Sequence, residues 1–440
     1  MSDTTENINN ENNENNEKTK LWLWLTTKPH LMRKAYRLYT DMGSIEAIYN
    51  AERTDYEKFK YLNTENINNL CDKTIKCNDI INACVHNSVR ILTIDDNDYP
   101  VLLREIDEPP VLLYCRGKFI DLNKYLCIGI VGTRDVSNYG SKCTYFIAKE
   151  AADYGAIIVS GMALGVDTVA HTGALEADMP TVAVLGCGVN NAYPKSNLHL
   201  MHQIMETGMV ISEYPLNSEP ERYHFPERNR IISGLSRGVA VIEADIKSGS
   251  LITAKCAYNQ NRDVFAVPGN INQIHSKGTN QLIRDGAYLI TSGDDIISHY
   301  RSNYPDEILT GLKTAQAIRA EKKRKIDTMA YIDENIDYRL YPPVKERQNQ
   351  NLNNITSISD ASAASRFKTP DRGTIKITKT EDLPPDERIL AYLSDTPMHI
   401  NKLCELCKLK ISDINSAVLC LEIAGKITKH PGNYYTKNTK

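Results

Sequence analysis

The sequence predicts an α/β protein whose central domain is a doubly wound, mainly parallel β-sheet. A small helical domain is expected before this sheet and a winged-helix domain after it. Three observations lead to this prediction. Between residues 125 and 300, short Val- and Ile-rich runs alternate with helix-length segments, which is the pattern of parallel strands buried on both faces. Helical periodicity dominates the segment before these runs and returns from residue 386. At 440 residues, the chain is also long enough for two or three domains.

Composition limits where the protein acts and what it binds. The chain has 52 basic and 55 acidic residues, a formal net charge of -3, so any basic binding site must be local. Its 11 cysteines lack the spacing of a disulfide framework, which indicates reduced thiols. The apolar run at 21–25 is far too short for a signal sequence or a membrane span. We therefore expect a soluble, cytoplasmic protein without a membrane partner.

The first 118 residues are expected to contain a tail and a small domain. Residues 1–19 are rich in Asn and Glu and have too little apolar surface to offset the entropy of ordering, so we expect a disordered tail. Residues 20–118 begin with helical periodicity and end in an extended lead-in, where Pro100, Pro109 and Pro110 interrupt any long helix. This segment is expected to be a small helical domain of the SAM or helix-hairpin-helix kind.

The core domain is expected over residues 119–305. Its seven expected strands are "YLCIGIVG", "AIIVSG", "TVAVLGCG", "MVISEY", "GVAVIEAD", "DVFAVPG" and "YLITSG". The segments between them have the length of helices, so the connections should be right-handed crossovers within one sheet.

The last 135 residues are expected to form a linker and a second domain. The basic run at 319–325 and the polar stretch that follows predict a largely unstructured linker over 306–384. Residues 385–440 contain three short amphipathic segments and a segment that resembles a two-stranded wing, the plan of a winged helix-turn-helix. The third helical segment, 412–425, has neither Lys nor Arg, so DNA binding and protein binding both stay open for this domain.

Candidate binding residues occur where strands end. Parallel sheets bind ligands at the carboxyl ends of their strands, and Gly132, Thr133 and Arg134 follow the first expected strand. The glycine permits close backbone approach, the threonine supplies a hydroxyl, and the arginine can hold phosphate oxygens beside the free N–H groups of a helix start. An exposed arginine in an ordinary turn is an equally good interpretation of this turn alone.

Later strand ends carry similar chemistry. The further candidates are Ser160 and Gly161 after the second strand, Lys195 after the third, Arg228, Asn229 and Arg230 beside Phe225, and Ser248, Gly249 and Ser250 after the fifth. Taken alone, Lys195 would be interpreted as a solvated surface charge. Asp167 and His171 share a helix face; we favour a capping carboxylate and a packed imidazole over a catalytic pair. Several phosphate-competent turns along one sheet edge suit the backbone of a single strand of nucleic acid.

Several motifs of enzymes are missing or misplaced. The sequence has no G-x-G-x-x-G after its first strand and no P-loop. The G-x-S-x-G at 234–238 precedes a strand instead of following one, so Ser236 is no nucleophile. Cys404 and Cys407 have no second ligand pair at zinc-finger spacing. We expect no catalytic residue, no metal and no cofactor.

A family resemblance rests on successive segments of the core. These are "VGTR", "SGMALGVDTVAH", "YPKSN", "FPERNRIISGLS", "EADIKSGSLITAKCA", "FAVPG" and "GTNQLIRDGA". Their order over about 98–300 resembles the family of the DNA-processing protein DprA, also called Smf. The resemblance implies a bacterial, cytoplasmic protein with a Rossmann-like core that is not an enzyme. It further implies binding and protection of single-stranded DNA during natural transformation, loading of the recombinase RecA against the single-strand-binding protein, and a homodimer formed through the core.

The same resemblance assigns the site residues. Arg134 and Lys195 match the family's main phosphate contacts, and the other candidates lie in motifs that resemble the lining of the same pocket. Leu164 departs from the pattern, because many members carry a basic residue there. The main alternative is a nucleoside-phosphate-processing enzyme of the related lysine-decarboxylase-like fold. Its P-G-G-x-G-T-x-x-E loop is replaced here by "EADIKSGSLITA".

Overall fold

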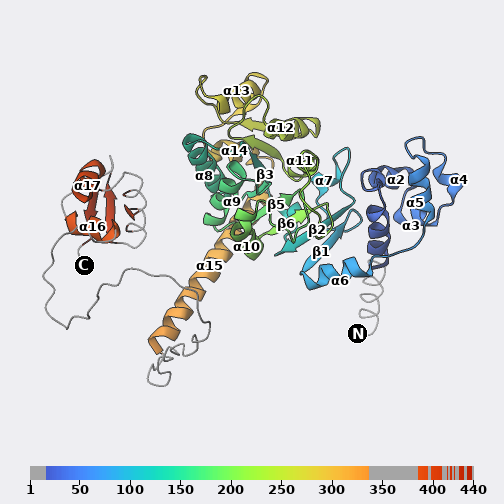
Figure 1. Cartoon of the computed structure of the whole chain (residues 1–440), viewed down its shortest axis with the longest axis horizontal. Coiled ribbons are helices and arrows are strands. Elements are labelled where there is room, and N and C mark those ends of the chain that lie inside the picture. Colours follow the sequence, from blue (N-terminus) through green and yellow to red (C-terminus); the bar gives the residue numbers. More distant parts are fainter. Residues whose placement is uncertain are drawn as a thin grey trace, which may run out of the picture. The chain divides into compact units, whose positions relative to one another are not determined.

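The computed structural model of the chain contains two compact units, Met1–Pro342 and Pro343–Lys440 (Figure 1). The structure describes residues 16–335 and, in the second unit, 385–394, 398–408, 426–430, 434–438 and positions 414, 417, 418 and 421. Residues 1–15 of the tail expected at 1–19, and residues 336–384 of the linker expected at 306–384, therefore lie outside the described residues. Within the described ranges, no helix is long and apolar enough to cross a membrane.

A cluster of short helices forms the N-terminal part of the first unit. A helix at 16–27 is followed by η1 (Met32–Lys34), α2 (Ala35–Met42), α3 (Ile45–Asn50), α4 (Arg53–Tyr56), α5 (Thr64–Cys71) and α6 (Asn78–His86). The first helix includes residues 16–19, which we had expected in the tail, because its continuation buries Trp22 and Trp24 completely in the core of this domain. Trp22 and Tyr39 each donate a hydrogen bond of 2.8 Å to the carboxylate of Asp95, which attaches the helices to the turn after β1 (Val89–Thr93).

The central sheet has nine strands in the order β1-β2-β6-β5-β4-β3-β7-β8-β9. The strands after β1 are β2 (Leu112–Gly117), β3 (Cys127–Val131), β4 (Ile157–Ser160), β5 (Thr181–Leu185), β6 (Met209–Ser212), β7 (Gly238–Val241), β8 (Asp263–Ala266) and β9 (Tyr288–Leu289). All seven strands expected from the sequence are present, and their pairings are parallel. The prediction of a doubly wound, mainly parallel sheet is confirmed. β3 to β7 are buried along their whole length, as their near-continuous apolar runs indicated.

Two strands of the sheet precede the expected start of the core at residue 119. β1 and β2 pair antiparallel with each other, and β2 pairs antiparallel with β6. The lead-in of the helical segment thus extends one side of the sheet. The prolines at 100, 109 and 110 obscured this in the sequence, since they lie in the connection between the two strands and not within either strand.

Helices cover both faces of the sheet (Figure 1). They include α7 (Val101–Arg104), α8 (Asn138–Asp153), α9 (Val166–Glu176), α10 (Leu198–Thr207), α11 (His224–Gly234), α12 (Ser250–Asn259), α13 (Lys277–Arg284) and α14 (Gly293–Tyr300). α8, α9 and α10 pack side by side, and α11 packs on α12. The chain moves from β3 to β6 in one direction and resumes at β7 on the other side of β3, so the topological switch point lies between β3 and β7.

The prediction of a linker from residue 306 is wrong for its first thirty residues. Pro305–Asn335 form one helix, α15, which includes the basic run at 319–325. Ala, Glu, Lys, Arg and Gln are strong helix formers, and Pro305 suits a first helical position. One side of the helix buries Ile308, Ala315 and Ile318. Arg319 forms an ion pair of 2.9 Å with Asp153 at the end of α8, so the helix is fastened to the core.

The second unit is a small helical domain with a three-stranded sheet. It contains α16 (Pro385–Tyr392), α17 (Ile400–Cys407) and helical positions 414, 417, 418 and 421. The sheet order is β10 (Met398–His399), β12 (Tyr434–Lys437), β11 (Ile427–His430). β11 and β12 form the expected wing. The cap expected at Ser412 or Asp413 lies outside the described residues.

The contact between Gly155 and Gly311 provides a test of how α15 is attached. A Cβ at Gly311 would overlap the carbonyl oxygen of Gly155. Gly155 has a φ of +95°, which favours glycine. We expect Gly311→Ala to lower the free energy of unfolding by about 1–3 kcal/mol through overpacking, despite the better helix propensity of Ala. Urea unfolding measures this change. Gln316→Ala, at an exposed position of the same helix, should leave the midpoint unchanged; equal midpoints for both variants would contradict the close packing.

Candidate nucleic-acid interface

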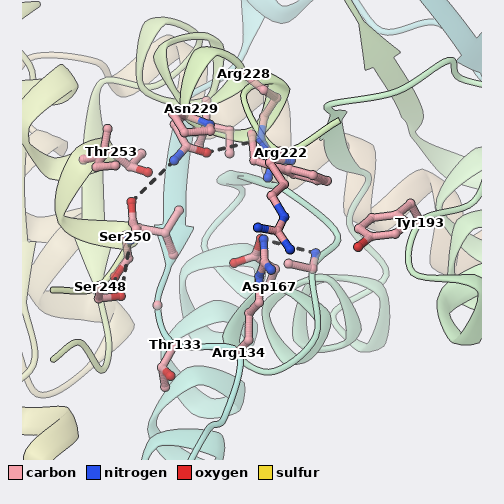
Figure 2. Close-up of a pocket in the computed structure, with 18 of the residues that line it drawn as sticks. Thr133, Arg134, Asp167, Tyr193, Arg222, Arg228, Asn229, Ser248, Ser250 and Thr253 are labelled. Atoms are coloured by element: carbon pink, nitrogen blue, oxygen red, sulfur yellow. Dashed lines mark hydrogen bonds between the residues drawn. The ribbon is translucent and has the colours of Figure 1, made fainter. Parts of the chain in front are cut away.

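A cavity of about 680 Å³ lies at the switch point of the sheet (Figure 2). Its walls come from the turn after β3, the turn after β4, the segment 220–232 and the start of α12. Ten of its lining residues are labelled in Figure 2: Thr133, Arg134, Asp167, Tyr193, Arg222, Arg228, Asn229, Ser248, Ser250 and Thr253. The cavity is therefore built from both halves of the doubly wound sheet, where α/β folds bind their ligands.

The turn after β3 presents Arg134 to this cavity. Gly132 allows the turn to pass close to α9, since a Cβ there would lie 2.5 Å from Val166. Thr133 donates its N–H to the carbonyl of Glu243 at 2.8 Å, which fixes the turn. The Arg134 side chain is exposed, and its guanidinium carbon lies 5.5 Å from the centroid of the Phe225 ring. Its hydrogen-bond donors remain available to a ligand.

The start of α8 does not offer an anion site, contrary to the expectation from the sequence. Ser137 caps the helix by accepting from the N–H of Gly140 at 3.0 Å. The buried carboxylate of Glu243, from the turn after β7, accepts from the N–H of Ser137 at 2.9 Å and from its hydroxyl at 2.5 Å. A carboxylate of the protein already occupies the positive end of this helix. The expectation was wrong because the partner lies 106 residues away in sequence.

The start of α12 faces the cavity and remains more open. Ser248, Gly249, Ser250 and Thr253 line the wall here. No described atom lies within 4 Å of an ideal Cβ at Gly249, so a ligand can approach the backbone. The two serine hydroxyls are 2.7 Å apart and can reorient toward a phosphate oxygen. Asn229 reaches this wall by donating to the carbonyl of Gly249 at 3.5 Å.

Arg228 forms the floor of the cavity. Only 4% of this residue is exposed, and its guanidinium donates to the carbonyls of Gly161, at 2.8 Å, and of Val184. The nearby carboxylate of Asp167 accepts from the N–H groups of Gly161 and Ala163. Burial lowers the pKa of Arg228 and raises the pKa of Asp167, while their opposite charges partly compensate. Arg228 and Asp167 therefore shape the floor of the cavity, and their hydrogen-bonding groups are largely occupied by other groups of the protein.

A second pocket of about 330 Å³ adjoins the first and brings Lys195 beside Arg134. Both pockets share Arg134, Tyr193 and Phe225. The rings of Tyr193 and Phe225 lie 5.4 Å apart. Lys195 is exposed and, in the described structure, has no acidic partner within ion-pair distance. Two cations from different strand ends thus stand beside aromatic surface, an arrangement that fits a nucleic-acid strand.

Two candidates from the sequence line neither pocket. The hydroxyl of Ser160 is buried and donates to the carbonyl of Ile130 at 2.7 Å, between β4 and β3. Arg230 points to the other side of α11, where it donates to both oxygens of Glu213 at 2.7 and 2.6 Å. Gly161 lines the second pocket only. The remaining candidates, from Gly132 to Ser250, line one or both pockets.

Sequence reasoning missed Arg222 and Tyr193. Arg222 lies in the loop before α11, and Figure 2 shows its side chain extending into the cavity. Its surroundings, "SEPERYHF", hold two acidic residues, Glu219 and Glu221, so counting the local charges gave no sign of a basic site there. Tyr193 directly precedes the "PK" of the Lys195 turn, and an aromatic residue beside a cation is the signal that could have identified it. In the described ranges, no group of three or more potential ligands could hold a metal ion.

Comparison with known proteins identifies the family. Residues 90–301 match the family model described as DNA recombination-mediator protein A, and 378–433 match the DprA winged helix domain. "Protein Smf" of Synechocystis is 34% identical over 353 residues, which cover 79% of this chain and 80% of that protein. The chain belongs to the DNA recombination-mediator protein A family. The resemblance to DprA and Smf seen in the sequence is thereby confirmed, as is the winged-helix domain.

A further relative and a solved structure from the same species agree with this assignment. The DNA processing protein DprA of Streptococcus pneumoniae is 44% identical over 208 residues, 47% of this chain and 73% of that protein. An X-ray structure of DprA from the same species has a TM-score of 0.57 at 34% identity, covering 63% of this chain and 95% of that chain. A Helicobacter pylori structure, described as giving insights into the single-stranded DNA binding mode of DNA processing protein A, has a TM-score of 0.45 at 34% identity, covering 50% and 98%.

The imidazole of His171 is buried away from the cavity. Its Nδ1 lies 2.8 Å from the hydroxyl of Thr181, which itself donates to the carbonyl of Ile158 at 2.6 Å. The hydroxyl must therefore accept from Nδ1–H, while Nε2 has no partner among the described residues. Burial, assisted by the charge of Arg228, lowers the pKa of His171 to about 3. This environment agrees with a packed imidazole.

The depressed pKa of His171 predicts a pH dependence of stability. The unfolded chain binds a proton at this histidine below about pH 6.5, whereas the folded protein does not until about pH 3. Stability from this group is therefore complete above pH 6.5 and falls by up to about 1.4 kcal/mol per unit as the pH decreases toward 3. Urea unfolding at pH 7, 6, 5 and 4 should show a shallower decline for His171→Gln than for the wild type. His202→Gln, at an exposed position, should reproduce the wild-type slope; identical slopes for all three proteins would refute the assignment.

Proposed function

We propose that this protein binds single-stranded DNA across the two adjoining pockets and acts there as a recombination mediator. The observation that carries the proposal is the placement of Arg134 and Lys195, two exposed cations from different strand ends that border one pocket. The net charge of -3 gives no general attraction for nucleic acid, so affinity must come from this local group. Membership of the recombination-mediator family supports the same function.

The shape of the site favours an extended strand over a single nucleotide. Cations occur at separated points: Lys195 borders only the smaller pocket, Arg222 only the larger, and Arg134 both. Tyr193 and Phe225 add aromatic surface where the pockets meet, on which bases can stack without regard to sequence. We propose that Gly132, Thr133, Asn229, Ser248, Gly249 and Ser250 complete the phosphate contacts, with Gly161 and Arg228 as supporting floor. Ser160 and Arg230 are not part of this proposal.

We further propose that the protein is not an enzyme. Asp167 is tied to backbone N–H groups of its own turn, and His171 is buried away from the pockets. Among the described residues that line the two pockets, this leaves no histidine that could act with a carboxylate as an acid–base pair. In this proposal a homodimer formed through the core protects the strand in the cytoplasm and loads RecA onto it against the single-strand-binding protein, during natural transformation or other recombination.

The proposal is tested by fluorescence anisotropy of a labelled single-stranded oligonucleotide over a salt series. Arg134→Ala and Lys195→Ala should each weaken binding to every sequence alike. Each should also reduce the slope of log affinity against log salt by about 0.7, the value for one lost phosphate contact on a single strand. The double variant should also lose any acceleration of RecA assembly on oligonucleotide covered by single-strand-binding protein. Lys313→Ala, on the exposed side of α15, is the charge-matched control and should bind like the wild type. If Arg134→Ala and Lys195→Ala also bind like the wild type, the proposal is wrong.

Arg222 supplies an independent prediction from the structure. We expect Arg222→Ala to weaken single-strand binding about tenfold, because a charge-assisted contact of roughly 1.5 kcal/mol is lost. Arg222→Lys should recover part of the affinity, since it restores the charge without the guanidinium geometry. The same anisotropy titration measures both. If Arg222→Ala binds like the wild type, the larger pocket holds no part of the strand.

A further inference from the structure

An arginine of the N-terminal helical domain is bound to two carboxylates of the core. The guanidinium of Arg33, in η1, forms an ion pair with Glu227 in the first turn of α11 and lies 3.4 Å from Oε2 of Glu213. Glu213 directly follows β6, so Arg33 contacts both ends of the segment 213–227. This segment carries Pro220, Arg222, Phe225 and Pro226 of the cavity wall.

The contact is partly shielded from water, and its charges are balanced. The side chain of Glu213 is only 5% exposed, and those of Arg33 and Glu227 are 29% and 35% exposed. Glu213 is shared with Arg230, and Tyr214 donates to Glu227 at 2.7 Å. Burial alone would lower the pKa of Arg33, yet the charge of Glu213 and the bond to Glu227 raise it. Burial alone would raise the pKa of Glu227, yet the bonds from Arg33 and Tyr214 lower it. Both groups therefore stay charged and attract each other strongly.

Arg33 itself does not line either pocket. Its effect on a ligand must pass through the segment that it holds. Phe225 and Glu227 lie in the same helical turn, and Arg134 stands over the ring of Phe225. A displacement of this turn would move the aromatic surface shared by both pockets and the loop that presents Arg222.

We infer that Arg33 is a positioning residue for single-strand binding: through Glu227 and Glu213, the N-terminal domain fixes the first turn of α11 and the loop before it in the conformation that binds DNA. The inference rests on the proposed function for its readout. It gives the N-terminal domain a role in affinity without any contact to the strand. It also provides a physical connection through which a change in this domain would alter the site.

Glu227→Gln separates positioning from general electrostatics by the sign of its effect. Removing a negative charge near a phosphate site should tighten DNA binding if charge alone matters. Loss of positioning should instead weaken binding, by about fivefold or more for a coupling of ordinary size. Arg33→Gln should weaken it by a similar factor, and Arg33→Lys should restore part of the affinity. The double variant should bind no more weakly than the weaker single variant, because both changes break one connection.

The controls are Arg37→Gln, which removes the same charge from the same domain, and Glu221→Gln, an exposed carboxylate of the same loop. Neither should weaken binding, and each protein's thermal midpoint is measured to verify that it is folded. Hydrogen exchange of 213–229 without DNA should be faster in Arg33→Gln and Glu227→Gln. The inference is overturned if Glu227→Gln binds DNA as tightly as the wild type or more tightly. It is also overturned if the loss of affinity in the double variant equals the product of the losses in the two single variants. If the wild type fails to bind the oligonucleotide, the proposed function fails, and the exchange rates alone decide whether Arg33 holds the segment.

Discussion

The architecture of the site depends on one buried guanidinium. Arg228 extends from α11 to the carbonyls that end β4 and β5, and so ties a helix from one half of the doubly wound sheet to the strands of the other half. Gly161 is required beneath it, since a Cβ there would overlap the guanidinium. A buried charge is stable only when its donors are satisfied. Here two main-chain oxygens accept from Nη1 of Arg228, and the side-chain oxygen of Asn229 accepts from Nε at 3.2 Å. The wall that contains Phe225 and Asn229 is consequently fixed relative to the strand ends.

The distribution of charge around this floor explains why side chains dominate the proposed interface. The positive start of α8 is occupied by Glu243, and the turn before α9 is occupied by Asp167. These internal carboxylates fill the anion positions that a nucleotide-binding fold of similar topology would leave to its ligand. Arg134, Lys195 and Arg222 are left as exposed cations, together with the open start of α12. A site of this kind binds a charged backbone along its length better than it binds one compact phosphate group.

The parts of the structure that the sequence predicted are those set by local pattern. Buried parallel strands have near-continuous Val and Ile runs, so β3 to β7 could be located, and with them the sheet edge at which we propose that DNA binds. Pairing between distant residues could not be predicted. From the sequence, Arg134 and Arg230 both looked free to bind a ligand, yet Arg230 forms an ion pair with Glu213, whereas Arg134 has no acidic partner in the described structure. The helix α15 was missed because its charged composition resembles a linker, while its few buried side chains and the contact between Gly155 and Gly311 become evident only in three dimensions.

The Glu243 carboxylate at the start of α8 also has a consequence for how the sequence can change over time. A Cβ at Gly140 would overlap the carboxyl group of Glu243, and Ser137 relies on the same group for two hydrogen bonds. A side chain at Gly140 would meet Glu243, and an apolar residue at Ser137 or Glu243 would remove these hydrogen bonds. Gly140, Ser137 and Glu243 thus constrain one another as a set, and relatives that lose the glycine should also have exchanged the glutamate for a shorter side chain. Packing alone, without any requirement from a ligand, therefore restricts which substitutions these positions at the edge of the proposed DNA site can accept.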